Sequence, residues 1–102
     1  MNIRLSPDAE LDLARGADFY NEIREGLGTY FNDCLASDID SLQLYAGIHA
    51  KIGGYYFTVS ERFPFAIYYN IEREFIVVYA ILDCREEPSV NERRLQDRGL
   101  ER

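Results

Sequence analysis

The sequence predicts an α+β fold, in which a sheet of mostly antiparallel strands packs against a helical hairpin. Two features of the chain lead to this prediction. Hydrophobic residues recur at helical spacing up to about residue 47, and after residue 50 they alternate in the pattern of strands. A glycine-containing turn at residues 26–28 divides the helical half into two helices. The predicted element order is therefore β-α-α-β-β-β-α.

The first elements have recognisable local signals. Residues 2–6 alternate polar and apolar side chains and predict a short strand. Ser6 and Pro7 predict a helix start, because serine caps free amide groups and proline already has a helical φ. A second helix is expected to run from the glycine turn to Gly47. The inner stripe of the first helix is expected to hold Ala9, Leu13, Ala17, Tyr20 and Ile23.

Three strands are predicted in the second half, over residues 55–59, 63–69 and 75–83. Residues 70–74 are polar and predict a tight hairpin connection between the last two strands. The strand over residues 75–83 is apolar on both faces, so we expect it in the interior of the sheet. Ser89 and Glu92 have the spacing of a capping box and predict a short basic helix at the end of the chain.

The length and charge of the chain limit its possible functions. The 102 residues are enough for one domain, spanning residues 1–102, and not for two. The net charge is −7, from 11 Lys and Arg against 18 Asp and Glu, which argues against non-specific binding of nucleic acid by the whole surface. Residues 1–46 hold nine of the acids and three of the bases, so the acidity belongs mainly to the predicted helical hairpin.

Cysteine content and hydropathy predict a cytoplasmic protein with reduced thiols. Two cysteines are too few for a disulfide scaffold, and neither has a second Cys or a His at the spacing of a metal site. We therefore expect no metal and no cofactor. The longest apolar run, residues 75–82, is far shorter than the roughly 20 residues of a membrane helix, and no secretory signal is expected at the start.

Four short segments, in this order, carry a resemblance to a known family. They are residues 3–10 (IRLSPDAE), residues 26–28 (GLG) with Phe31, residues 62–69 (RFPFAIYY), and residues 77–85 (VVYAILDCR) with Pro88. The sequence resembles the RelE/ParE toxin superfamily, the toxins of type II toxin–antitoxin (plasmid stabilisation) systems. The resemblance covers residues 2–95 and implies the RelE/ParE-like fold.

The resemblance also implies two possible activities. RelE-type toxins cut mRNA in the ribosome with several Lys and Arg on the sheet and a C-terminal Tyr, whereas ParE-type toxins lack this set and poison DNA gyrase. Arg62 and Arg85 match two of the family's arginines, but Glu86 stands where a second paired arginine is usual. The strand at residues 55–60 has no basic residue, and no Tyr follows Tyr79. These departures favour the ParE type.

We therefore expect a ParE-like toxin that is no enzyme, binds a target such as DNA gyrase, and is neutralised by a cognate antitoxin whose C-terminal segment wraps around it. Two alternatives stay open. One is a RelE-like, ribosome-dependent mRNA endonuclease with Lys51, Arg62 and Arg85 as catalytic candidates, which is the only reading that requires contact with nucleic acid. The other is a degenerate, non-toxic member that only binds an antitoxin or forms a homodimer.

The expected partner-binding surface runs over the outer face of the helical hairpin and on to the sheet. Leu11 falls there among Arg15, Asp18 and Glu22, where no core is available to it. A single exposed leucine is a modest signal, but the resemblance implies that an amphipathic antitoxin helix lies against this hairpin. Since the hairpin is acidic, the partner segment is expected to carry Lys or Arg beside its apolar residues.

Three further residues carry expectations. Asp38 falls in the apolar stripe of the second helix and must therefore be paired, with Arg24, Tyr20 or Tyr45 available nearby. Cys84 stands beside Arg85, which would lower the pKa of its thiol, although a packing role is the simpler interpretation. His49 has no partner at a recognisable spacing and is interpreted as a loop residue.

Overall fold

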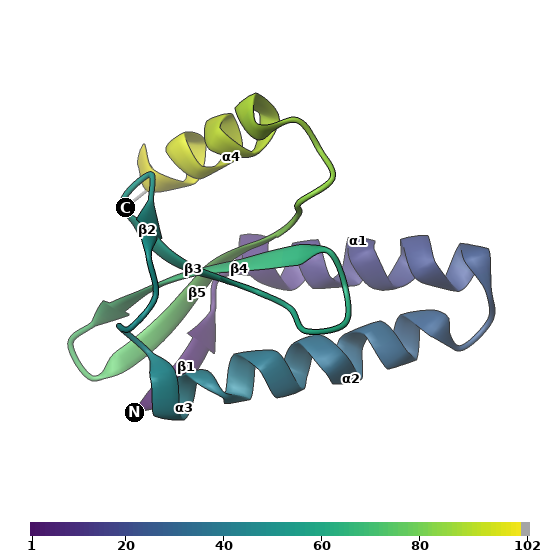
Figure 1. Cartoon of the computed structure of the whole chain (residues 1–102), viewed down its shortest axis with the longest axis horizontal. Helices are drawn as coiled ribbons and strands as arrows, with labels where there is room; N and C mark the ends of the chain where they lie inside the picture. Colours follow the sequence, from purple (N-terminus) through teal and green to yellow (C-terminus); the bar gives the residue numbers. More distant parts are fainter. Residues whose placement is uncertain (101–102) are drawn as a thin grey trace.

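The computed structural model describes residues 1–100 and has the predicted order of elements, with two short additions, α3 and β2 (Figure 1). The helices are α1 (Pro7–Ile23), α2 (Leu27–Asp40), α3 (Leu42–Tyr45) and α4 (Pro88–Leu100). The strands are β1 (Asn2–Leu5), β2 (Lys51–Ile52), β3 (Tyr55–Val59), β4 (Phe65–Glu72) and β5 (Phe75–Asp83).

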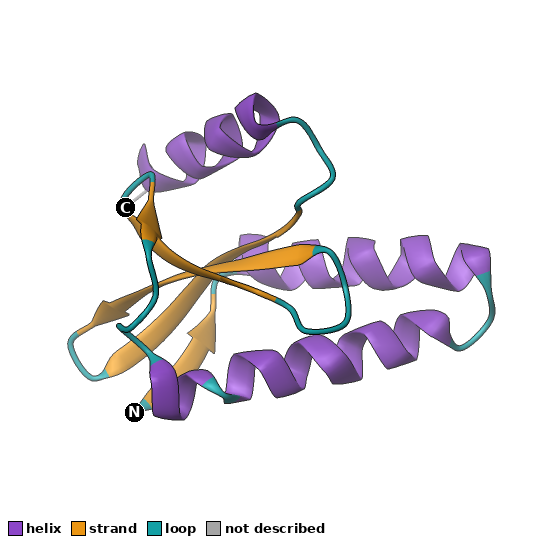
Figure 2. Ribbon diagram, viewed as in Figure 1, coloured by secondary structure: helices purple, strands orange, loops and turns teal. Residues whose placement is uncertain are grey.

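The five strands form one mixed sheet in the order β1-β5-β4-β3-β2. β1 runs parallel to β5, and the other neighbouring pairs are antiparallel. β5 lies between β1 and β4, so the prediction of an interior strand is confirmed. The α1–α2 hairpin covers one face of the sheet, while α4 lies on the opposite side (Figure 2).

Each face of the sheet has its own hydrophobic core. The larger core joins the α1–α2 hairpin to the sheet around Phe31, Leu35 and Ile67, none of which is exposed. The smaller core lies on the other face, where Leu95 of α4 packs against β3, β4 and β5. This division explains why β5 is apolar on both sides, because Ile76, Val78 and Ile81 enter the larger core while Ala80 and Leu82 enter the smaller one.

The start of α1 follows the sequence prediction. Ser6 is the N-cap, and its Oγ accepts a hydrogen bond from the Ala9 amide at 3.1 Å, while Pro7 is the first helical residue. At the other end, Gly26 has φ 87°, which allows the chain to turn into α2. The turn brings Gly28 against α1, where its amide donates to Asn21 Oδ1 at 2.7 Å.

Two expectations about the helical hairpin are wrong. Ile23 is 62% exposed instead of buried, because the far end of the hairpin extends beyond the sheet and has no core to enter (Figure 1). The second helix also ends earlier than expected, at Asp40. After Ser41, whose Oγ donates to the Asp38 carbonyl, α3 turns Leu42 into the core and leaves Tyr45 on the surface.

Two connections also differ from the sequence prediction. β4 continues to Glu72, so only Arg73 and Glu74 link it to β5, and Arg73 adopts the left-handed φ of 57°. α4 begins at Pro88, one residue before the expected Ser89 cap. The Val90 amide donates to the Glu87 carbonyl at 3.0 Å, so the helical turn starts before Ser89.

Asp38 is hydrogen-bonded, as its position in the apolar stripe predicts. Its Oδ2 accepts from Ser60 Oγ at 2.5 Å. None of the three expected partners provides this contact, because the stripe faces the connection between β3 and β4 at that point. The requirement for a partner is therefore confirmed, while its identity was predicted wrongly.

Candidate partner-binding site

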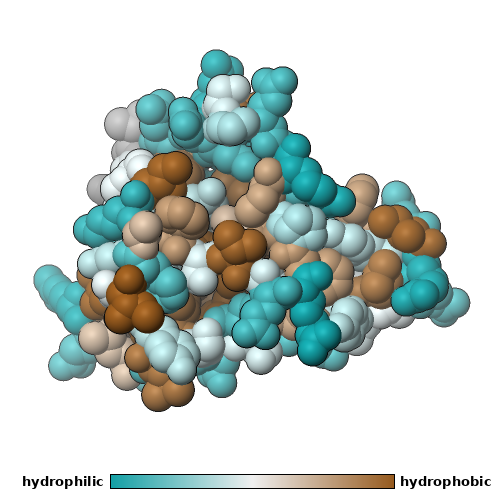
Figure 3. All heavy atoms as spheres, in the orientation of Figure 1, coloured by the Kyte–Doolittle hydropathy of each residue, from teal (hydrophilic) through white to brown (hydrophobic). Residues whose placement is uncertain are grey.

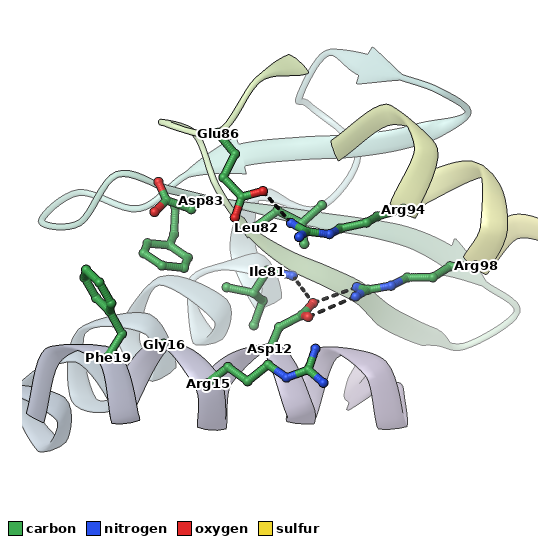
Figure 4. Close-up of a pocket in the computed structure, with 11 residues that line it drawn as sticks. Asp12, Arg15, Gly16, Phe19, Ile81, Leu82, Asp83, Glu86, Arg94 and Arg98 are labelled. Carbon is green, nitrogen blue, oxygen red and sulfur yellow. Dashed lines mark hydrogen bonds and ion pairs between the residues drawn. The ribbon is translucent and has the colours of Figure 1, made fainter. Parts of the chain in front are cut away.

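A groove of about 280 Å³ runs between α1 and α4 (Figure 4). One wall comes from α1 and the other from α4, while the end of β5 forms the floor. Charged residues from three separate parts of the chain line it, together with one exposed aromatic ring. These residues are Asp12, Arg15 and Phe19 of α1, Asp83 and Glu86 at the end of β5, and Arg94 and Arg98 of α4.

A buried ion pair joins the two walls. Arg98 Nη1 lies 2.6 Å from Asp12 Oδ2, and Arg98 Nη2 lies 2.9 Å from Asp12 Oδ1, in the bidentate geometry that guanidinium favours. Asp12 is 8% exposed, and the Arg98 side chain is 14% exposed. The hydrogen bonds that Arg98 donates to Asp12 raise the pKa of Arg98.

The same pair also holds the sheet. The Ile81 amide donates to Asp12 Oδ2 at 2.9 Å, and Arg98 Nη1 donates to the Tyr79 carbonyl at 3.1 Å. The pair therefore fixes α1, β5 and α4 relative to one another. The sequence prediction missed it, although Asp12 stands at helical spacing from Ala9 and is thus in the buried stripe.

Further ion pairs occupy the mouth of the groove. Arg94 Nη1 contacts Glu86 Oε2 at 2.8 Å, and Arg85 Nη2 contacts Asp83 Oδ2 at 2.8 Å. The Arg85 guanidinium holds the pKa of Asp83 below its usual value. In contrast, Arg15 makes no ion pair with any residue between 1 and 100, so its charge is available at the α1 wall.

All four residues of the predicted partner-binding surface lie exposed on the outer face of α1. They are Leu11, Arg15, Asp18 and Glu22. Leu11 is 46% exposed. Phe19, which the sequence prediction did not include, is 49% exposed and faces the groove one turn after Arg15 (Figure 4). The face therefore offers two large apolar side chains among charged residues.

The three catalytic candidates do not converge. Lys51 Nζ lies over the Tyr56 ring, 4.6 Å from its centroid, at the sheet edge beyond β3. Strand pairing aligns Lys51 with Val78, five residues before Asp83 on β5, which is about 16 Å along the strand. Arg85 follows Asp83 and is paired with it. Lys51 and Arg85 therefore belong to different parts of the surface.

Arg62 lies in a third place. It follows β3 and lines a small cavity on the α2 side, together with Asp33, Cys34 and Asp38. The groups around Arg62 are mainly acidic. Arg85 lies elsewhere, facing α1, with its guanidinium carbon 5.9 Å from the Phe19 ring centroid. Of five cavities described in residues 1–100, only the one beside Arg62 is lined by any of the three candidate residues.

The thiol of Cys84 is not activated by the neighbouring arginine. Partial burial raises its pKa, and the negative charge of Asp83 raises it further. Arg85 is engaged with Asp83, so the idea that it lowers the thiol pKa is wrong. Cys84 is exposed and belongs to neither hydrophobic core. His49 does have a partner that its sequence position did not indicate, since its Nδ1 contacts the hydroxyl of Tyr69.

Residues 1–100 contain no group of three or more His, Cys, Asp or Glu arranged to hold a metal ion. Within the same part of the chain, each helix is too short or too polar to cross a membrane.

The same strand–hairpin–sheet–helix arrangement is present in a solved structure. A solved chain from the "Chromosomal ParDE TA system from P. aeruginosa" superposes on this one with a TM-score of 0.72. The match covers 79% of this chain and 92% of the other, with 19% sequence identity. No protein-family model matches the sequence, and a search among curated proteins gives no match. The relationship is thus established at the level of the fold.

Proposed function

We propose that this chain is the ParE-like toxin of a type II toxin–antitoxin system in the cytoplasm. It acts by binding a target such as DNA gyrase, and a cognate antitoxin holds it inactive. The observation that carries the proposal is the fold shared over most of both chains with a member of a ParDE complex. Fold alone does not define an activity, so the arrangement of the charged residues must also be compatible with the proposed binding function.

The positions of the basic residues support binding over catalysis. Cleavage of a phosphodiester requires cationic groups around one phosphate and a positioned acid–base pair. Lys51, Arg62 and Arg85 lie apart, and Arg85 is neutralised by Asp83. This distribution disfavours the RelE-like endonuclease and leaves a binding mode as the better fit.

The outer face of α1 is the antitoxin-binding surface in this proposal. Leu11 and Phe19 supply apolar anchor points, and the exposed acids Asp18 and Glu22 select a partner with basic residues. In an amphipathic helix, apolar residues at positions i and i+7 or i+8 are separated by about the same distance as the side chains of Leu11 and Phe19 on α1. The partner segment is accordingly a helix with Lys or Arg beside its apolar face.

The decisive experiment is induced expression with and without the cognate antitoxin. We expect growth arrest with a DNA-damage response and inhibition of gyrase supercoiling in vitro, both relieved by the partner. Cleavage of mRNA on ribosomes that disappears in Arg62→Ala would instead identify an endonuclease. Tight binding of the partner without any growth defect would identify a non-toxic binding module.

A substitution tests the binding surface itself. Leu11→Asp is expected to weaken the complex with the antitoxin by roughly tenfold or more, because it places a charge at an apolar contact. The matched control is Leu44→Asp, which changes an exposed leucine on a different helix, α3. Isothermal titration calorimetry of both variants measures the difference. Equal affinity of parent and Leu11→Asp would remove α1 from the interface.

A further inference from the structure

We propose that two copies of this chain associate through the α3 patch, an apolar surface formed by Leu44, Tyr45 and Ile48. These residues are 80%, 51% and 74% exposed. Hydrophobic side chains are visible on the surface over α3 and the segment that leads to β2 (Figure 3). The proposal does not depend on the toxin function.

The α3 patch is held in place from beneath. Leu42 is fully buried and anchors α3 in the larger core. The Gly47 amide donates to the buried hydroxyl of Tyr69 at 2.9 Å, and His49 Nδ1 contacts the same hydroxyl. Because both ends of the segment are fixed, the exposed side chains are presented by a pre-organised backbone, which lowers the entropic cost of binding.

Charge identifies the occupant as a second copy. Residues 41–50 contain no Asp, Glu, Lys or Arg, and seven of these ten residues are exposed. Two other charge-free runs, residues 63–71 and 75–82, contain no exposed residue, while a third, residues 52–60, has four, at Ile52, Gly53, Gly54 and Val59. Two chains that each carry a net charge of −7 repel one another, so they approach best where the surface is uncharged.

The exposed apolar cluster at the far end of the helical hairpin does not fit a second copy. Phe19, Ile23 and Tyr30 lie at the far end of the helical hairpin and are about half exposed or more. Asp18 and Glu22 lie exposed beside them, so two copies meeting there would bring like charges together. The far end of the helical hairpin is therefore suited to a basic partner, whereas the uncharged α3 patch is suited to the same patch on a second copy.

The geometry and size of the contact follow from symmetry. A two-fold axis brings the α3 patch against itself, so one surface serves both copies. Pairing between β2 edges is disfavoured, because it would place Lys51 of one copy near Lys51 of the other. The segment supplies fewer residues than the roughly 20–30 per side of a standard interface, so we expect a dissociation constant on the order of 10–100 µM.

Sedimentation equilibrium tests the proposal. From about 5 µM to about 500 µM, the apparent mass is expected to rise from 11.9 kDa toward twice that value. Raising the salt concentration is expected to strengthen association, because it screens the repulsion between the two acidic chains. Ile48→Glu and Leu44→Glu are each expected to weaken association at least tenfold, and the control Ile23→Glu, also at an exposed isoleucine, to leave it unchanged.

Circular dichroism confirms that the variants are folded, as expected for changes at exposed positions. The proposal is overturned if the parent stays monomeric at every concentration and salt level. It is also overturned if Ile23→Glu abolishes association while Ile48→Glu and Leu44→Glu preserve it. Association that weakens with salt would show that charged surfaces bring the copies together, and would equally exclude the α3 patch.

Discussion

At the scale of single residues, the ion pair between Asp12 and Arg98 matters most for the arrangement of the groove. Removing two charges from water is costly, and their attraction repays this cost only when the remaining polar atoms are also satisfied. Here the Ile81 amide and the Tyr79 carbonyl provide those additional hydrogen bonds. Loss of one partner leaves the other charge buried without compensation.

Arg98→Met is therefore expected to lower the free energy of unfolding by about 3–5 kcal/mol, since it leaves Asp12 uncompensated. Urea denaturation measures this change. The control is Arg94→Met, because the Arg94–Glu86 pair is more than 40% exposed on both sides and is expected to contribute at most about 1 kcal/mol. Similar losses in the two variants would contradict a structural role for the buried pair.

Asp83 gives the stability of the protein a dependence on pH. Its pKa lies below the ordinary value of 3.8 because Arg85 donates hydrogen bonds to it. The unfolded state therefore binds more protons than the folded state in acid, and stability rises with pH through this range. The contribution is complete well above pH 3.8 and disappears as the pH falls through the lowered pKa.

Asp83→Asn is expected to be less stable than the parent at pH 7, with a difference that shrinks as the pH falls below 3.8. Thermal unfolding of both proteins between about pH 2 and pH 7 measures the difference. Because the Arg85 side chain is 52% exposed, the effect at pH 7 is expected to be about 1 kcal/mol or less. A difference that stays constant with pH would contradict the assignment.

Residue-level prediction succeeded where the signal was local and failed where the partner was distant in sequence. Asp38 interrupts an apolar stripe, so its need for a partner was visible, but Ser60 lies 22 residues away. Asp12 gave the same signal and was overlooked, and its partner Arg98 lies 86 residues away. Spacing along a helix identifies which face a carboxylate occupies, but the element that faces it is set by tertiary structure.

At the scale of elements, the close contact between α1 and α2 depends on glycine. A Cβ at Gly28 would lie 2.2 Å from the Ala17 carbonyl oxygen, far inside van der Waals contact. The obstacle is backbone, so it cannot move away as a flexible side chain would. The two helices pack closely because position 28 has no side chain.

Gly28→Ala is accordingly expected to destabilise the protein by about 1–3 kcal/mol or more, since the helices must separate. The higher helix propensity of alanine offsets only about 1 kcal/mol of this cost. Thr29→Ala, at the exposed neighbouring position, serves as the control and is expected to change stability by about 0.5 kcal/mol or less. Equal unfolding midpoints for the two variants would show that the helices tolerate the extra methyl group.

Helices and strands were predicted best where the pattern of hydrophobic residues continued without interruption over the whole element. The structure has β3 and β5 over the predicted residues 55–59 and 75–83. The division between α2 and α3 was missed, because Leu42 and Tyr45 continue the helical spacing beyond the actual break. The bend at Ser41 is favoured because it buries Leu42 beside β1. This tertiary contact cannot be predicted from the spacing of hydrophobic residues along the helix.

At the scale of the whole molecule, the charges of this chain give opposite salt effects for its two proposed contacts. Attraction between the acidic hairpin and a basic antitoxin segment accelerates their encounter at low salt. Self-association through the uncharged α3 patch must instead overcome the repulsion between two acidic chains.

The association rate with the antitoxin is thus expected to fall by tenfold or so between about 50 mM and about 500 mM salt, as the Debye length shortens. Stopped-flow fluorescence measures this rate, and the dissociation rate is expected to change less and serves as the internal comparison. A salt-independent association rate would show that the acidity of the hairpin serves solubility and not recognition.

The parallel pairing of β1 with β5 also determines when the chain can complete its fold. Asn2 aligns with Phe75, so the first strand stays without its neighbour until most of the chain has been made. Pairing over such a separation gives a high contact order, which slows folding. During synthesis, the α1–α2 hairpin can form early from local contacts, but the sheet closes only after β5 has left the ribosome. A chain cut short before β5 lacks the strand that joins β1 to β4 and contributes to both hydrophobic cores, so it can complete neither core.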